Sequence, residues 1–288
     1  MRDTILFGDC RETLKEFDEK ARMCVTSPPY YGLRDYGGED SQIGQEQTPE
    51  EFIDELVKVF REVKNVLTDD GTLWVNVGDS YYNYRPGRGQ GLAKQTVSNT
   101  KQDLPDVCPR RGNRLEGLKE KDLIGIPWMF AFAMRADGWH LRQDIIWNKP
   151  NPMPESVRDR CTKSHEYIFL FSKSQNYYFD VDAIKEPTRR KRSVWNVQKK
   201  PYRGAHFAVY PPDLIEPCVL AGSEEGDIVL DPFMGSGTTA MVAKSLGRVY
   251  NGCELHEDYG NLIQQRVEEY EPLKELSQEP SINILDIV

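Results

Sequence analysis

The sequence has 288 residues, of which 39% are apolar and 29% are charged, a composition that excludes a disordered or fibrous chain. The mean hydropathy is −0.62, and no stretch approaches the ~18 uninterrupted apolar residues of a membrane-spanning helix. The opening residues, MRDTILFGDC, lack the basic and apolar regions of a secretory signal. We therefore expect a folded cytoplasmic protein with no membrane partner.

The six cysteines and four histidines are scattered through the chain and form no CxxC or HExxH pattern. Patterns of that kind mark zinc and redox sites, so we predict no metal site. Isolated cysteines in a cytoplasmic protein are expected to be reduced.

The net charge of −9 is unevenly distributed. Residues 84–121 carry nine Lys or Arg and four Asp or Glu, and residues 158–203 carry twelve and five. Clustered lysine and arginine bind polyanions because they neutralise phosphates and release condensed counterions. The two basic segments therefore indicate a nucleic-acid partner, although solvated charged loops would have the same composition.

Short apolar runs alternate with amphipathic segments along the chain. A capping box with proline at the first helical position, Thr48–Glu51, opens a helix that Asp69–Gly71 is expected to end. Short, nearly continuous apolar runs suit strands buried on both faces, so the alternation predicts an α/β fold with a doubly wound, mostly parallel sheet. The predicted strands are 22–26, 72–77, 144–147, 166–171, 227–230 and 249–253, and the further helices are 127–136, 213–221, 238–246 and 257–270.

Two segments, 81–122 and 173–205, have little apolar periodicity and coincide with the basic segments. Loops of this length within a compact domain are usually functional or disordered. An aromatic residue there, such as Trp195, either stacks on a base or packs beneath the loop. The most concentrated positive charge lies at Arg189, Arg190, Lys191 and Arg192, and at Arg110 and Arg111.

The segment Thr26-Ser27-Pro28-Pro29-Tyr30 directly follows a predicted strand. Two prolines restrict the backbone and remove two N–H donors, so this turn should be stiff. Open α/β sheets bind ligands at the carboxyl ends of their strands. There the turn would aim a hydroxyl, a free carbonyl and an aromatic ring at one point, which suits an exocyclic amine on a flat ring. A proline turn beside a buried tyrosine is the alternative interpretation.

A second strand leads into Asp231-Pro232-Phe233-Met234-Gly235-Ser236-Gly237-Thr238. Glycines let the backbone approach a ligand, and the following helix start presents free N–H groups. The Gly-Lys-Ser/Thr ending of a Walker A loop is absent. The next predicted strand ends in Glu254, a carboxylate placed to accept hydrogen bonds from ribose hydroxyls. The pair predicts an adenosine-containing ligand.

Together these residues resemble the amino-group DNA methyltransferases, which use S-adenosylmethionine. Residues 231–239 look like the cofactor motif of that family and residues 26–30 like its catalytic motif, in the order of the permuted group called beta. Asp9, after an opening strand, looks like the acid that lies near the adenine. Residues 146–152 and 164–167 look like later motifs of the catalytic half. The resemblance spans about residues 3–270.

The resemblance implies one permuted methyltransferase domain with S-adenosylmethionine as its cofactor. Its parts would be a catalytic half (1–80, continued at 123–172), a basic insertion (81–122), a candidate target-recognition region (173–205), a cofactor-binding half (206–270) and a tail (271–288). The implied catalytic residues are Ser27, Pro28, Pro29 and Tyr30, and the implied cofactor-binding residues are Asp9, Asp231, Pro232, Phe233, Gly235, Ser236, Gly237, Thr238 and Glu254. The candidate DNA-binding residues are those of the two Arg/Lys clusters.

The chemistry implied by the resemblance is methyl transfer to an aryl amine. The Ser27 hydroxyl and the Pro28 carbonyl would hold the two N–H groups so that the nitrogen lone pair faces the methyl carbon, and Tyr30 would stack on the base. A base inside a duplex cannot reach such a site, so it must flip out at a cost of a few kcal/mol. Serine before Pro-Pro-Tyr favours N4 of cytosine in this family, with N6 of adenine second.

Two other functions are less favoured by the sequence. Enzymes that methylate glutamine in proteins or bases in RNA are disfavoured by the motif order and by the two basic loops. A regulatory DNA-binding module on a degenerate fold is disfavoured by the intact Ser27, Tyr30, Asp231 and Glu254. The expected partners are double-stranded DNA, a cognate restriction endonuclease and a second copy of the chain, in a bacterial cell or a phage-infected host.

Overall fold

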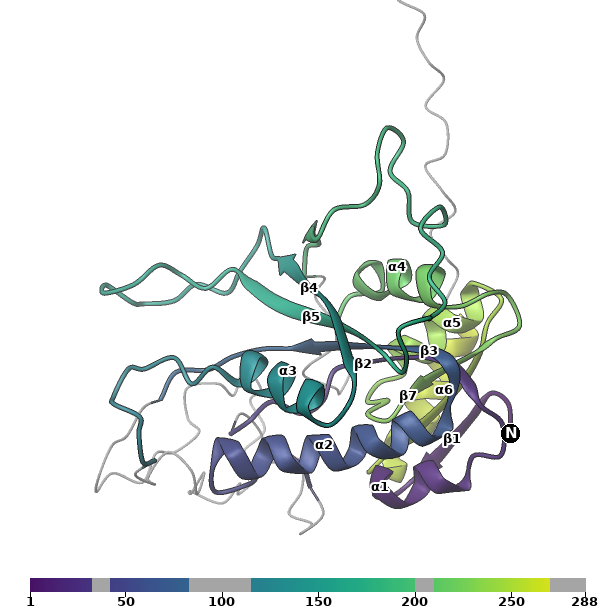
Figure 1. The fold of residues 1–288 in the computed structure, drawn as a ribbon, viewed down its shortest axis with the longest axis horizontal. Coiled ribbons are helices and arrows are strands. Elements are labelled where there is room, and N and C mark those ends of the chain that lie inside the picture. Colours follow the sequence, from purple (N-terminus) through teal and green to yellow (C-terminus); the bar gives the residue numbers. More distant parts are fainter. Residues whose placement is uncertain (33–41, 83–114, 200–209, 270–288) are drawn as a thin grey trace, which may run out of the picture.

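The computed structural model describes residues 1–32, 42–82, 115–199 and 210–269. Within these ranges, eight strands form one sheet in the order β1-β8-β7-β2-β3-β5-β4-β6 (Figure 1). The strands are β1 (Thr4–Phe7), β2 (Ala21–Thr26), β3 (Leu67–Val77), β4 (His140–Asn148), β5 (His165–Ser172), β6 (Val194–Asn196), β7 (Ile228–Asp231) and β8 (Val249–Glu254). The α-helices are α1 (Cys10–Thr13), α2 (Pro49–Val66), α3 (Ile126–Ala136), α4 (Pro212–Gly222), α5 (Thr238–Ser245) and α6 (Gly260–Glu269).

The sheet is mostly parallel. Strands β1, β8, β7, β2 and β3 pair in parallel, β5 is antiparallel to both β3 and β4, and β6 is parallel to β4. Because two antiparallel pairings follow each other, β4 runs in the same direction as β2 and β3. The carboxyl ends of β2, β3, β4, β7 and β8 therefore lie at one edge of the sheet, and the predicted fold class is confirmed.

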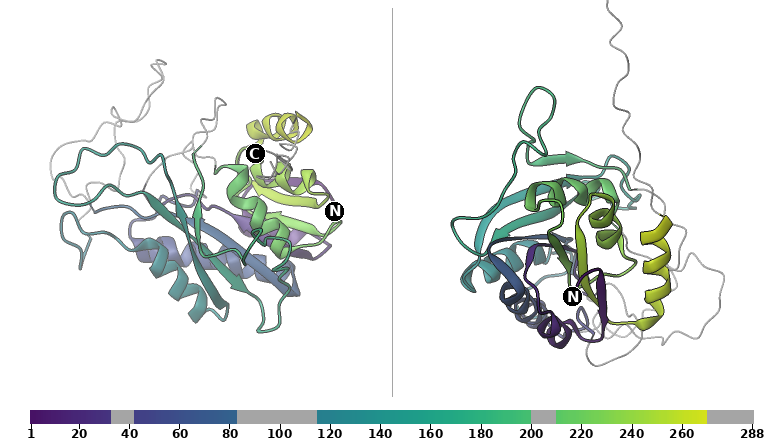
Figure 2. Two further views of the ribbon diagram at one scale, coloured as in Figure 1. Left: turned by 90° about the horizontal axis from the view of Figure 1, so that it is seen from above. Right: turned by 90° about the vertical axis from the view of Figure 1, so that its right-hand side faces the viewer.

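Helices cover both faces of the sheet, and each face has its own apolar core (Figure 2). Leu73 and Val75 of β3 point to the face covered by α2 and α3, where they share a core with Phe60 and Phe130. Trp74, between them in sequence, points to the other face and joins the core that α4, α5 and α6 cover. This period of two is the pattern of a strand buried on both sides.

The start of α2 is as predicted, but its end is not. Thr48 Oγ1 accepts the Glu51 N–H at 3.1 Å, and the Glu51 carboxylate accepts the Thr48 N–H at 3.2 Å, which completes the capping box. The helix ends at Val66, and Asp69–Gly71 lie inside β3 instead of in a turn. A Cβ at Gly71 would stand 2.9 Å from the Thr68 carbonyl oxygen and 3.1 Å from that of Arg22, so this glycine permits close backbone approach.

The segment 173–205 contains a strand that the sequence did not reveal. Residues 194–196 pair with 146–148 at the outer edge of the sheet. Trp195 is 5% exposed and donates from its indole to the Arg192 carbonyl at 2.7 Å. This aromatic residue therefore packs in the core and is not presented to a base. Most of the segment 81–122 lies outside the described residues.

No helix within the described ranges is long and apolar enough to cross a membrane.

Candidate active site

The two sequence motifs begin at neighbouring strand ends. β2 ends at Thr26 and β7 at Asp231, and the two strands pair in parallel with Cys24 opposite Leu230. Thr26 Oγ1 donates to Asp231 Oδ1 at 2.5 Å. The Ser-Pro-Pro-Tyr turn and the glycine turn therefore leave the sheet side by side, from one point on its carboxyl edge.

The Asp231 carboxylate faces the protein interior. It is 1% exposed and also accepts hydrogen bonds from the Phe233 N–H at 2.9 Å, from the Tyr210 hydroxyl at 3.2 Å and from Thr239. Burial raises the pKa of this carboxyl against the opposing effect of these donors. Asp231 therefore links the end of β2, the glycine turn and α5.

The glycine turn adopts a backbone conformation that favours glycine at two positions. Gly235 and Gly237 have positive φ values of 55° and 80°, and a Cβ at Gly237 would stand 2.6 Å from Ile263 Cγ2. Ser236 and Thr238 are buried, and Arg266 of α6 contacts both. Arg266 also donates to the Ser236 carbonyl at 2.6 Å. These two side chains are thus turned towards α6, and no local sequence signal pointed to Arg266.

Pro232 and Phe233 complete the inner part of this turn. Pro232 is buried, and Phe233 packs edge-on against Phe60 of α2 with 6.5 Å between the ring centroids. Phe233 therefore anchors the turn to the core on the α2 side.

Glu254 lies at the end of β8, the strand next to β7. Its carboxylate is 8% exposed and accepts the Gly235 N–H at 2.8 Å and the His256 N–H at 3.1 Å. Burial raises the pKa of Glu254, while the two backbone donors oppose the shift. The acid is therefore held directly beside the glycine turn.

Asp9 lies after β1, on the far side of β8. It caps α1 and receives the Arg11 guanidinium, whose Nε is 2.9 Å from Oδ1, and Arg11 also pairs with Glu55 of α2 at 2.5 Å. Burial acts to raise the pKa of Asp9, but the hydrogen bonds from Arg11 outweigh it and lower the pKa. Register pairs Phe7 with Glu254, so Asp9 and Glu254 belong to the same edge of the sheet.

These residues fit an adenosylated cofactor. Gly235, which has a positive φ, is partly exposed beside Glu254, and the Glu254 carboxylate would offer acceptor oxygens to ribose hydroxyls. His256 Nε2 is shielded from solvent and has no hydrogen-bond partner among the described residues, so a polar ligand group beside Glu254 would satisfy it.

The Ser-Pro-Pro-Tyr turn contacts β3 and β5. The Ser27 hydroxyl lies 3.5 Å from Asn76 Oδ1, and the Tyr30 hydroxyl donates to Glu166 Oε2 at 2.8 Å. A Cβ at Gly78 would stand 2.5 Å from Tyr30 Cε2, so the tyrosine ring rests on the bare backbone of this glycine. Pro29 packs close to Gly44, where an added Cβ would be 3.2 Å from the proline Cβ. Asn76 and Gly78 were not among the predicted site residues.

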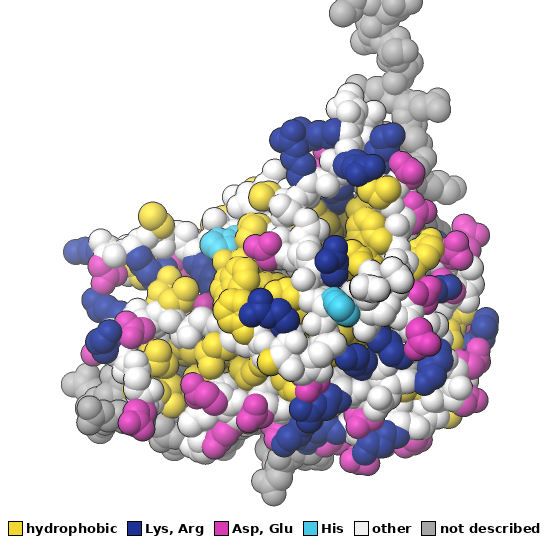
Figure 3. Space-filling model, viewed as in Figure 1, with side chains coloured by type: hydrophobic (Ala, Val, Ile, Leu, Met, Phe, Trp, Pro, Cys, Tyr) yellow, Lys and Arg dark blue, Asp and Glu magenta, His cyan; other side chains and the backbone are white. Residues whose placement is uncertain are grey.

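Of the two basic clusters, the structure describes one. Arg189, Arg190 and Arg192 are exposed in the connection between β5 and β6, with Arg189 paired to Glu186 at 2.5 Å and Lys191 5.0 Å from the ring centroid of Trp195. Lys and Arg side chains gather on the segment that projects at the top of the view (Figure 3). Arg110 and Arg111 lie outside the described residues.

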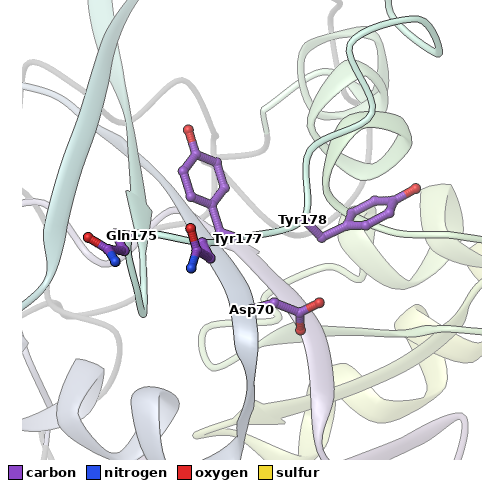
Figure 4. Close-up of a pocket in the computed structure, with 5 residues that line it drawn as sticks. Asp70, Gln175, Tyr177 and Tyr178 are labelled. Carbon is purple, nitrogen blue, oxygen red and sulfur yellow. The ribbon is translucent and has the colours of Figure 1, made fainter.

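An open depression lies elsewhere, and we exclude it from the site. It is lined by Asp70, Gln175, Asn176, Tyr177 and Tyr178 (Figure 4). Asp70 is near the start of β3, so the depression lies at the opposite edge of the sheet from the two turns. Within the described ranges no group of three or more His, Cys, Asp or Glu side chains is arranged to hold a metal ion.

The sheet and the paired turns define the class as a Rossmann-like methyltransferase fold, and comparison with known proteins supports this. A family model described as DNA methylase matches residues 21–265. The chain is 48% identical over 271 residues to the Type II methyltransferase M.Cfr9I of Citrobacter freundii, covering 92% of this chain and 87% of that one.

Two solved structures share the fold. The PvuII DNA methyltransferase (cytosine-N4-specific) superposes with a TM-score of 0.67 at 20% identity over 94% of this chain and 87% of that one. TTHA0409 from Thermus thermophilus, solved with S-adenosyl-L-methionine, gives 0.63 at 26% identity over 91% and 92%. The chain thus belongs to the N6/N4 DNA methylase family: it is a Type II DNA methyltransferase, and S-adenosylmethionine is its cofactor.

Proposed function

We propose that the enzyme methylates the exocyclic N4 amine of cytosine at a specific site in duplex DNA, with the base flipped out of the helix. The observation that carries this proposal is the junction of Thr26 with Asp231, which sets the Ser27–Tyr30 turn beside the glycine turn. A sulfonium at one turn and an aryl amine at the other would meet with little further motion. Positioning of this kind supplies ~7–11 kcal/mol in favourable cases.

In this proposal the cofactor lies at the glycine turn, with Glu254 accepting ribose hydroxyls and Asp9 at the adenine end. The cofactor supplies an already activated methyl group. Three side chains of the turn support its shape and do not contact the cofactor, because they form hydrogen bonds within the protein: those of Asp231, Ser236 and Thr238. The partly exposed backbone at Gly235 then provides the surface against which the cofactor rests, and Gly237 lets the turn pack against α6.

The target amine would be held by two acceptors, the Ser27 hydroxyl and the Pro28 carbonyl, which favour a tetrahedral nitrogen with its lone pair aimed at the methyl carbon. Tyr30 would stack on the flipped base. The choice of cytosine rests on the neutral hydroxyl of Ser27 in the place where an adenine enzyme of this family carries aspartate or asparagine. N6 of adenine is the second candidate.

DNA is held, in the same proposal, by the connection between β5 and β6. The strand β6 pairs with the last three residues of β4, and the arginine cluster ends two residues before β6 in the chain. We propose residues 173–205 as the target-recognition region and 81–122, with Arg110 and Arg111, as an additional clamp. A cognate restriction endonuclease and a homodimer are the proposed partners.

Mass spectrometry of digested DNA tests the proposal. Duplex DNA is incubated with the enzyme and S-adenosylmethionine, and the nucleosides are compared with those from Ser27→Ala. We expect N4-methylcytosine from the wild type, with a rate about 100-fold lower for Ser27→Ala, the scale for losing one preorganised polar contact. N6-methyladenine without N4-methylcytosine would refute the choice of base, and an undiminished Ser27→Ala rate would refute the role of Ser27.

A further inference from the structure

A chain of polar side chains lies behind the Ser27–Tyr30 turn, and the proposed reaction does not itself use it. Lys149, directly after β4, forms an ion pair with Glu166 of β5, and Asn76 of β3 lies between Glu166 and Ser27. We infer that Lys149, Glu166 and Asn76 form a positioning array that makes the Ser27 oxygen an acceptor for the target amine. The inference rests on the proposed role of Ser27.

The orientation of the Asn76 side chain follows from its neighbours. Its nitrogen lies 3.1 Å from the Tyr167 carbonyl oxygen and 3.4 Å from Glu166 Oε2. A carbonyl oxygen and a carboxylate oxygen can accept a hydrogen bond but cannot donate one, so the atom that faces them must be the amide nitrogen. The amide oxygen must then face the other way, where the hydroxyls of Ser27 and Tyr30 lie at 3.5 Å and 3.3 Å. Asn76 is therefore oriented as an acceptor towards the catalytic turn.

The distances decide which hydroxyl donates to Asn76. A phenol has one proton, and the Tyr30 hydroxyl is 2.8 Å from Glu166 Oε2 but 3.3 Å from Asn76 Oδ1. Tyr30 therefore donates to the carboxylate, and the amide oxygen of Asn76 is left for the single proton of Ser27. With that proton directed at Asn76, both lone pairs of the Ser27 oxygen remain to accept an amine N–H. The 3.5 Å contact is long, and we expect it to shorten when the base is bound.

Lys149 holds the Glu166 carboxylate in the position from which it contacts Tyr30 and Asn76. It is 6% exposed, its ammonium lies 4.1 Å from the ring centroid of Trp147, and it contacts Glu166 Oε1 while Oε2 serves Tyr30 and Asn76. Buried ion pairs are commonly no more stabilising than apolar residues of similar volume, so fold stability alone does not explain the pair. Asn76 carries an amide, which accepts a hydrogen bond but takes no proton, so the array orients Ser27 and does not relay a proton.

Two double variants separate orientation from folding. Lys149→Met with Glu166→Gln keeps an acceptor oxygen for Tyr30, whereas Lys149→Met with Glu166→Met removes it, and neither leaves an unpaired buried charge. Single-turnover methyl transfer is measured at saturating DNA and S-adenosylmethionine, with the cofactor Kd and the melting temperature. Asp227→Asn, which neutralises a carboxylate paired with Arg22 at the opposite edge of the sheet, is the control.

We expect the Met/Gln variant to transfer methyl within about tenfold of the wild-type rate and the Met/Met variant to be slower by about 100-fold, with an unchanged cofactor Kd. Asp227→Asn should keep the wild-type rate. Equal rates for the two double variants would overturn the inference.

A second measurement does not depend on whether the double variants fold. Asn76→Leu removes the acceptor for the Ser27 proton, so Ser27→Ala should slow the wild type by about 100-fold but add little to Asn76→Leu. Equal effects of Ser27→Ala in both backgrounds would overturn the inference. If the wild-type enzyme modifies adenine, only the proposed base is refuted. The N4 amine of cytosine and the N6 amine of adenine need the same acceptor, so the rates of the variants relative to the wild type would be expected to stay the same.

Discussion

Thr26 and Asp231 are 205 residues apart in the chain, and the hydroxyl of the first donates to Oδ1 of the second at 2.5 Å. Both side chains are buried, at 0% and 1% exposure. Since Ser27 follows Thr26 directly and the glycine turn follows Asp231, this one contact sets the spacing between the turn that would hold the base and the turn that would hold the cofactor.

Thr26→Val should uncouple the two turns. The substitution keeps the shape of the side chain but leaves Asp231 without one of its donors, so we expect a loss of ~1–3 kcal/mol in the free energy of unfolding and weaker cofactor binding. Denaturant titration and calorimetry measure both quantities. Thr26→Ser, which keeps the hydroxyl, is the matched control, and indistinguishable values for Val and Ser would contradict the coupling.

Gly78→Ala should displace the Tyr30 ring, because the new Cβ would stand 2.5 Å from Tyr30 Cε2. We expect kcat/KM for DNA to fall by about tenfold or more while cofactor affinity is kept, which methylation kinetics and calorimetry report. The control is the same substitution in a Tyr30→Ala background, where no ring remains to be moved. An equally large effect of Gly78→Ala in that background would show that the alanine side chain does not act by displacing the Tyr30 ring.

Arg266→Met removes the guanidinium that contacts Ser236 and Thr238 from α6. The glycine turn should become less well ordered, and we expect the Kd for S-adenosylmethionine to rise about tenfold, or ~1.4 kcal/mol. Arg135→Met, on α3 at the other face of the sheet, is the comparison. A Kd equal to that of Arg135→Met would mean that α6 does not support the cofactor site.

Cofactor affinity should depend on pH through Glu254. Burial raises the pKa of this carboxyl, so it gains a proton at a higher pH than an exposed glutamate. If the carboxylate accepts ribose hydroxyls, affinity is full at high pH and falls as the pH drops towards that raised pKa, which is above the pH at which an exposed glutamate gains its proton. Calorimetric titration of wild type against Glu254→Gln tests this, since the amide should bind more weakly with a flat profile. A flat wild-type profile would rule out the ionised acid as the ribose acceptor.

Replacing Arg189, Arg190, Lys191 and Arg192 with alanine should weaken DNA binding and flatten its salt dependence, by roughly 0.9 in the logarithmic slope for each phosphate that is no longer neutralised. The measurement is DNA binding by fluorescence anisotropy at several salt concentrations. Lys15→Ala with Lys20→Ala, in the connection between β1 and β2, serves as the control. A slope unchanged by the arginine-cluster variant would exclude phosphate binding there.

The parts of the fold that depend on local sequence patterns, such as apolar runs and the turns after them, could be predicted from the sequence. Strands such as β2 and β7 are mostly apolar and are followed by proline or glycine turns, so their type and the edge they share could be predicted from sequence. The three-residue β6 could not, because it depends on pairing with β4, about 50 residues earlier in the chain. Asp69–Gly71 have the composition of a turn but lie within β3, where close contact with Arg22 of β2 outweighs local preference.

The candidate site was predictable in its backbone turns and less so in the side chains behind them. Asn76 is part of a predicted strand, and its importance comes from Glu166, 90 residues away, which no local signal connects to it. The local sequence does not distinguish Arg266 from other helix residues, because its contact with the glycine turn depends on how α6 packs. Long-range contacts of this kind depend on packing across the sheet, which one sequence does not contain.

The most direct test of the account is a crystal structure of the enzyme with duplex DNA and an unreactive S-adenosylmethionine analogue. We expect the analogue at the glycine turn and a flipped cytosine at the Ser27–Tyr30 turn, with the amine nitrogen within hydrogen-bond reach of the Ser27 hydroxyl and the Pro28 carbonyl. The group that replaces the methyl should point at that nitrogen, at about 3–3.5 Å. A target base bound away from Ser27, or an analogue bound away from the glycine turn, would contradict the account.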